Sequence, residues 1–134
     1  MKYIIDTHVL LWTMGDDQKL SDTSKEILQD KQHDIYISIM SFWEIAIKRS
    51  SGKLEMYISL SELWDFALDN DISILPVVYA DVETIETLPF PKRNSIEHRD
   101  PFDRMIIAQS QTNDLQIISC DDKFDLYENV VRIW

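Results

Sequence analysis

The chain has 134 residues, of which 45% are hydrophobic, and a formal net charge of -11. This length and apolar content predict one globular domain over residues 1–134 and exclude a disordered chain. Only two glycines are present, which excludes a glycine-rich phosphate-binding loop. With one cysteine and no pattern of a signal peptide or membrane span, we expect a cytoplasmic protein.

The spacing of apolar and β-branched residues predicts, in chain order, a strand over residues 1–5, a helix over 8–14 and a surface helix over 21–31, with Ser21 as its N-cap. A strand over 35–39 and a helix over 41–50 come next. A helix over 59–69, a strand over 72–77 and a helix over 78–88 follow. An ordered basic loop over 88–99 leads into a helix over 101–113, and strands over 115–119 and 130–133 come last. This alternation predicts an α/β fold with a mainly parallel sheet that helices cover on both faces.

The charge balance, 24 acidic against 13 basic residues, argues against binding of nucleic acid through bulk electrostatics. Solubility alone can explain such a charge. The negative charge has two alternative explanations. One is a clustered acidic site that needs a cation, and the other is an acidic surface that binds a basic partner. The basic residues concentrate in two stretches, which hold Lys48, Arg49 and Lys53, then Lys92, Arg93, Arg99 and Arg104.

Four carboxylates occupy positions where parallel sheets bind ligands. Asp6 follows the first strand, Glu44 lies one turn into the helix after the second, and Asp121 follows the strand over 115–119. Because the carboxyl ends of parallel strands share one edge, we expect these acids to meet there. Asp103, in the first turn of the helix over 101–113, joins them if that helix packs alongside.

Each acid taken singly also fits helix capping. Asp100 before Pro101 is a typical N-cap, and Asp103 would then complement the helix dipole. The segment from Ser41 to Glu44 matches a capping box. Plain caps are also possible at Asp6 or Thr7, and at Asp121 or Asp122. Caps do not require an acid at every junction, so four acids on one edge favour a binding site.

Carboxylates gathered at one place raise one another's pKa unless a cation neutralises them. Oxygen ligands suit Mg²⁺ or Mn²⁺, whereas zinc is disfavoured because His8, His33 and His98 lack ligand spacing. Such a metal supports phosphodiester cleavage. A basic rim could then hold the phosphate backbone through Lys48, Arg49, Lys92, Arg93, Arg99 and Arg104. Alternatively, Arg104 pairs with Asp100, and Lys48 and Arg49 serve a helix C-terminus.

Four segments, in this order, resemble the PIN-domain family, in particular ribonuclease toxins of the VapC type: YIIDTHVLLW, SIMSFWEIAIKRSSGKL, HRDPFDRMIIAQS and LQIISCDDKFDLY. The resemblance implies a three-layer α/β/α sandwich and a Mg²⁺- or Mn²⁺-dependent endoribonuclease. It also implies a homodimer and inhibition by a cognate antitoxin whose C-terminal segment occupies the active-site groove. An arginine or lysine from that segment would suit an acidic groove.

The residues that match the four family acids are Asp6, Glu44, Asp103 and Asp121. Thr7 and Ser41 match small hydroxyl positions beside the first two acids, where they orient ligands or a water. Asp100 could support or replace Asp103, and Asp122 lies next to Asp121, so both remain supporting candidates.

Two other classes of protein compete with the endoribonuclease hypothesis. One is a non-catalytic PIN-like module that works through protein contacts. The other is a response-regulator receiver, which requires an acidic pair after the first strand. Here Asp6 is followed by Thr7 and His8, which disfavours the receiver.

Overall fold

A five-stranded parallel sheet runs through the computed structural model, which describes residues 1–134. Its strand order is β3-β2-β1-β6-β7. The strands are β1 (Lys2–Ile5), β2 (Asp34–Ser38), β3 (Ile72–Leu75), β6 (Gln116–Ile118) and β7 (Arg132–Ile133). The predicted α/β fold with a mainly parallel sheet is confirmed.

Six α-helices connect or follow these strands, and all of them were predicted. They are α1 (Thr7–Gly15), α2 (Asp22–Gln29), α3 (Ile39–Ser50), α4 (Leu60–Asp69), α5 (Tyr79–Thr87) and α6 (Pro101–Asn113). Two short 3-10 helices, η1 (Asp17–Lys19) and η2 (Asp122–Leu126), complete the set. Ser21 caps α2 as predicted, because its side chain accepts a hydrogen bond from the backbone N–H of Ser24.

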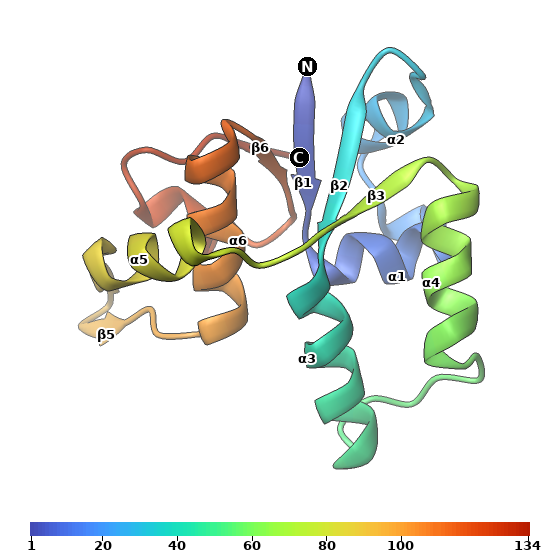
Figure 1. Ribbon diagram of the computed structural model, residues 1–134, viewed down its shortest axis with the longest axis horizontal. Helices are drawn as coiled ribbons and strands as arrows, with labels where there is room; N and C mark the ends of the chain where they lie inside the picture. The colour runs from blue at the N-terminus through green and yellow to red at the C-terminus, as the bar shows by residue number, and fades with distance from the viewer.

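Both faces of the sheet are buried, which explains why the central strands read as continuous apolar runs. In β1, Tyr3 and Ile5 pack into one core while Ile4 packs into a second core on the opposite face. The first core is completed by α1, α3 and α4, and the second by α6 and η2. Figure 1 shows α5 and α6 on one side of the strands and α1, α2 and α4 on the other. The three-layer α/β/α arrangement is thus confirmed.

The loop predicted over residues 88–99 contains a small antiparallel hairpin, formed by β4 (Lys92–Arg93) and β5 (Ile96–Glu97). Its turn residues, Asn94 and Ser95, both have positive φ values, of 53° and 66°. Left-handed conformations at both central positions match the twist of a two-residue hairpin. The hairpin brings His98 to the start of α6.

The strand order reverses direction beside β1, because the chain proceeds to β2 and β3 on one side and to β6 and β7 on the other. Ligands bind at such switch points, outside the carboxyl ends of the strands. Here the backbone N–H of Asp6 donates to the carbonyl oxygen of Ile118 at 3.0 Å, which joins the ends of β1 and β6. None of the helices has the length and apolar character needed to cross a membrane.

Candidate active site

Asp6 lies at the end of β1 with 7% of its surface exposed. It occupies the N-cap position of α1, yet its side chain makes no capping hydrogen bond. Instead, Asp6 Oδ2 accepts a hydrogen bond of 2.8 Å from Ser119 Oγ, at the end of β6. Burial raises the pKa of Asp6. The plain-cap interpretation is therefore wrong for Asp6, which is held by its neighbour across the switch point.

Glu44 is not part of a capping box, because α3 begins earlier than the sequence pattern predicted. Ser38 is the N-cap, and its Oγ accepts a hydrogen bond of 3.1 Å from the backbone N–H of Met40. Glu44 thus lies inside the helix, and its Oε1 accepts a hydrogen bond of 2.7 Å from Thr7 Oγ1. Thr7 Oγ1 also bonds Ser41 Oγ at 2.8 Å. The two hydroxyl residues support Glu44.

Lys48 contacts the second oxygen of the same carboxylate. Its Nζ donates to Glu44 Oε2 at 2.7 Å, one helical turn away in α3. This hydrogen bond raises the pKa of Lys48. Lys48 therefore balances the charge of Glu44.

Asp100 and Asp103 have different roles at the start of α6. Asp100 Oδ1 accepts from the backbone N–H groups of Phe102, at 2.9 Å, and Asp103, at 3.0 Å. Asp100 is thus the predicted N-cap, with Pro101 at the first helical position. Asp103 makes no cap, and its side chain is 20% exposed.

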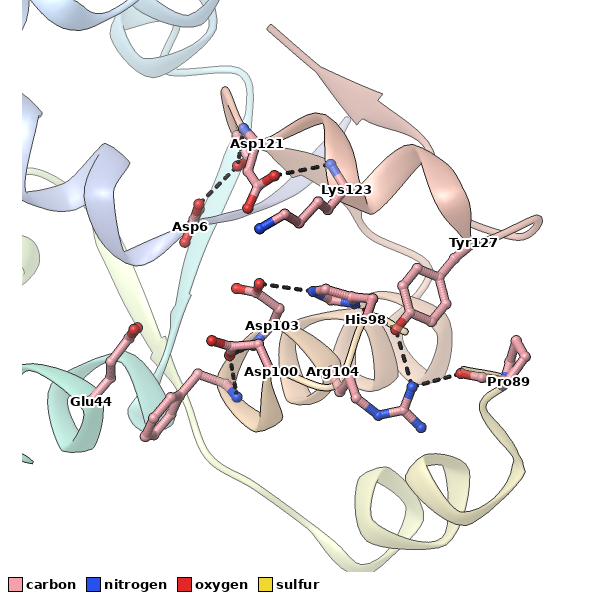
Figure 2. A network of polar contacts seen from close by, with 12 residues as sticks. Asp6, Glu44, Pro89, His98, Asp100, Asp103, Arg104, Asp121, Lys123 and Tyr127 are labelled. Atoms are coloured by element: carbon pink, nitrogen blue, oxygen red, sulfur yellow. Dashed lines mark hydrogen bonds and ion pairs between the residues drawn. The ribbon is translucent and has the colours of Figure 1, made fainter. Parts of the chain in front are cut away.

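Burial and the neighbouring acids change the electrostatics of Asp103. Burial, followed by the charges of Asp100, Asp6, Asp121 and Glu44, raises the pKa of Asp103 to about 8. Figure 2 shows these carboxylates arranged around a shared space, with Asp6 and Asp121 on one side and Glu44 on another. Asp6, Glu44, Asp103 and Asp121 therefore lie near enough to influence one another electrostatically, beside the carboxyl edge of the sheet.

Asp121 both faces this space and caps η2, since its Oδ1 accepts a hydrogen bond of 3.0 Å from the backbone N–H of Lys123. Its own N–H donates to Ser119 Oγ at 3.0 Å, so Ser119 links Asp121 with Asp6. Asp122 is exposed and pairs with Arg93 Nη1 at 2.6 Å. This pairing ties Asp122 to β4 rather than to the acid set.

The donor chemistry of the site fits a hard divalent cation, because the four side chains offer only carboxylate oxygens. As they stand, no three Asp, Glu, His or Cys side chains are close enough to hold one ion. Binding of a single ion by three of the acids would therefore require their side chains to rotate toward one another. Burial and the charges of the neighbouring acids raise the pKa of Asp103, and a bound cation would favour its ionised form instead.

The structure contradicts one member of the predicted basic rim. Arg104 is 5% exposed, and its guanidinium donates to the carbonyl oxygens of Leu88 and Pro89, so it cannot contact a phosphate and does not pair with Asp100. Periodicity could not reveal this, because both carbonyl groups lie in a distant segment. The other rim residues reach the surface, fully or in part: Lys48, Arg49, Lys92, Arg93 and Arg99.

The sequence prediction missed three polar residues beside the acids: Ser119 and His98, which contact Asp6 and Asp103, and Tyr127, which contacts His98. Ser119 directly follows β6, so the strand-end rule that identified Asp121 could have found it. His98 Nε2 lies 3.1 Å from Asp103 Oδ2, and its Nδ1 lies 2.7 Å from the hydroxyl of Tyr127. No local signal indicates this contact, because Tyr127 is 29 residues away along the chain.

A protein-family model described as PIN domain matches residues 3–129. The fold is similar to a chain in the crystal structure of VapBC2 from Rickettsia felis bound to a promoter DNA fragment. The TM-score is 0.70 at 15% identity, over 99% of this chain and 98% of that one. A toxin–antitoxin complex from Klebsiella pneumoniae gives a TM-score of 0.61 at 16% identity, over 98% and 96% of the two chains.

A comparison with curated proteins gives no match. At such identities the structural likeness concerns the fold, whereas the family model covers nearly the whole sequence. The resemblance to PIN domains that the four sequence segments indicated is confirmed. The chain belongs to the PIN-domain family.

Proposed function

We propose that this protein is a Mg²⁺- or Mn²⁺-dependent endoribonuclease and the toxin of a toxin–antitoxin pair. The observation that supports the proposal is that Asp6, Glu44 and Asp121 lie near Asp103, beside the switch point of a PIN-domain sheet, and influence its charge. Membership of the family and the likeness in fold to chains of toxin–antitoxin complexes support it.

The four acids would hold the cation, and each has its own support. Ser119 fixes Asp6, while Thr7 fixes Glu44 with the help of Ser41. A bound divalent cation supplies charge neutralisation at the phosphate and lowers the pKa of a water. Preformed hydrogen bonds to the carboxylates reduce the number of side chains that must be ordered when the site is loaded.

The substrate would be held by the exposed and half-exposed basic residues that surround the acids. Lys92, Arg93 and Arg99 come from the β4–β5 hairpin and its exit, and Lys48 and Arg49 come from the end of α3. Arg93 and Arg99 now pair with Asp122 and Glu97, at 2.6 Å in each case. Exposed pairs of this kind are weak, so a phosphate can replace the carboxylate.

The proposal includes a cognate antitoxin, a homodimer and a cytoplasmic location. An acidic edge repels RNA until a cation is bound, and it attracts a basic protein segment under the same conditions. We therefore expect an inhibitory antitoxin segment to place an arginine or lysine beside the carboxylates. An inhibitory segment without a basic residue near them would contradict this part of the proposal.

The test compares cleavage of a labelled RNA by the parent protein, by Asp6→Asn and by Asp65→Asn. Asp65 is exposed on α4 and serves as the matched control. We expect Mg²⁺- or Mn²⁺-dependent cleavage by the parent and the control, its loss in EDTA, and a fall of at least about 100-fold in Asp6→Asn. Equal cleavage by Asp6→Asn would show that the acids do not catalyse. A folded parent that neither cuts RNA nor binds Mn²⁺ would identify a non-catalytic binding module.

A further inference from the structure

Behind Asp103, a chain of buried polar side chains runs away from the acid site. His98 is 8% exposed, Tyr127 is 3% exposed and Arg104 is 5% exposed. Contacts link them in this order: Asp103 Oδ2 to His98 Nε2, His98 Nδ1 to the Tyr127 hydroxyl, and that hydroxyl to Arg104 Nη1. Figure 2 shows the chain extending from Asp103 to Pro89. Polar groups this deeply buried require defined partners.

Arg104 sets the direction of every hydrogen bond in this chain. A guanidinium only donates, and Arg104 Nη1 lies 3.0 Å from the Tyr127 hydroxyl oxygen, which therefore accepts. The hydroxyl hydrogen of Tyr127 is left for His98 Nδ1, at 2.7 Å. Arg104 itself is immobilised by the carbonyl oxygens of Pro89, at 2.6 Å, and Leu88, at 3.2 Å.

The tautomer of His98 follows from this direction. An imidazole nitrogen that accepts from Tyr127 carries no hydrogen, so in the neutral ring the hydrogen is on Nε2. Nε2 then donates to Asp103 Oδ2 at 3.1 Å. The opposite tautomer would leave the Tyr127 hydroxyl with two donors and no acceptor.

We propose that His98 is a positioning residue for Asp103, held as the Nε2–H tautomer by Tyr127 and Arg104. Its N–H engages Oδ2 and leaves the other carboxylate oxygen available to a cation. The role in metal binding rests on the proposed function, whereas the tautomer does not. The contact with His98 is the hydrogen bond that the Asp103 side chain makes, so without it the orientation of this carboxylate would not be fixed.

One test measures Mn²⁺ affinity by calorimetry in the parent, His98→Gln and His98→Leu. The glutamine amide can donate from about the position of Nε2, whereas leucine fills space without donating. Loss of such a supporting partner costs roughly 10- to 100-fold in metal affinity. We therefore expect that loss in His98→Leu and an affinity within about threefold of the parent in His98→Gln. Parental affinity in folded His98→Leu, or equal losses in both variants, would overturn the proposal.

A second test needs neither metal nor RNA, and it remains decisive if His98→Leu does not fold. Nitrogen-15 NMR of the histidine rings distinguishes the two tautomers in the metal-free parent and in Tyr127→Phe. We expect the Nε2–H form of His98 in the parent, and a mixture that includes Nδ1–H in Tyr127→Phe. An Nδ1–H form in the parent, or no change in Tyr127→Phe, would overturn the proposal. A parent that binds no Mn²⁺ would refute the proposed function, while the NMR result would still decide the tautomer of His98.

Discussion

Replacing Asp103 by asparagine should stabilise the metal-free protein near neutral pH. The pKa of Asp103 rises from 3.8 to about 8 in the folded chain because of burial and the four neighbouring acids. At pH values between these two pKa values, Asp103 is protonated in the folded protein and ionised in the unfolded chain. Stability therefore falls as the pH rises through this range, since ionised Asp103 favours the unfolded state. Asparagine carries no charge in the folded or the unfolded state, so the stability of the variant does not depend on pH through this residue.

Between these pH values the folded protein binds one proton more than the unfolded chain. The unfolding free energy therefore falls by about 1.4 kcal/mol per pH unit. From pH 5 to pH 7 the parent should lose roughly 3 kcal/mol relative to Asp103→Asn. For a chain of this size, 1 kcal/mol shifts Tm by about 3–5 °C. The difference in Tm between the two proteins should thus grow by about 10 °C over this interval.

The assay is thermal unfolding followed by circular dichroism at pH 5, 6 and 7 in the presence of EDTA. All other titrating groups are common to both proteins, so the difference between the curves isolates Asp103. Parallel curves for the parent and Asp103→Asn would refute the reasoning. Repeating the series with saturating Mg²⁺ provides the control, because a bound cation should remove the penalty for ionising Asp103.

Three further predictions concern the neighbours of this residue. Arg104→Met should lower the unfolding free energy by about 3 kcal/mol in denaturant titrations, because buried carbonyl groups lose their donors. Asp100→Ala should cost about 1 kcal/mol in the same measurement by removing the N-cap, whereas Asp100→Asn should cost only a few tenths. Lys48→Met should raise Mn²⁺ affinity up to about fivefold in calorimetry, since Lys48 competes for Glu44, and should weaken RNA binding in gel-shift assays.

Much of the fold was predictable because its signals are local. Short β-branched runs indicated each strand, and the Asp100–Pro101 pair located the start of α6 to the residue. The carboxyl-edge rule predicted from strand positions alone that Asp6, Glu44 and Asp121 lie beside the same edge of the sheet. The start of α3 was misplaced because Ile39 and Met40 extend an apolar strand pattern, while Ser38 provides the cap.

The remainder depends on contacts between distant parts of the chain. Arg104 lies among other basic residues in the sequence, which is why it was predicted to be part of the rim. Its burial depends on the position of residues 88 and 89, whose carbonyl oxygens accept hydrogen bonds from its guanidinium. His98 lacks the spacing of a metal ligand, and its contact with Asp103 becomes meaningful through Tyr127, which η2 and the turn after it place beside the ring. Such partners follow from packing, which no short motif encodes.

Calorimetric titration of Mn²⁺ into EDTA-treated, dialysed protein tests the central claim most directly, because it measures the acid site without assuming an RNA target. The parent and Asp65→Asn should bind saturably, and Asp6→Asn should bind at least about tenfold more weakly. Absence of saturable binding to the folded parent, or equal binding by Asp6→Asn, would contradict the claim that these carboxylates form a metal centre.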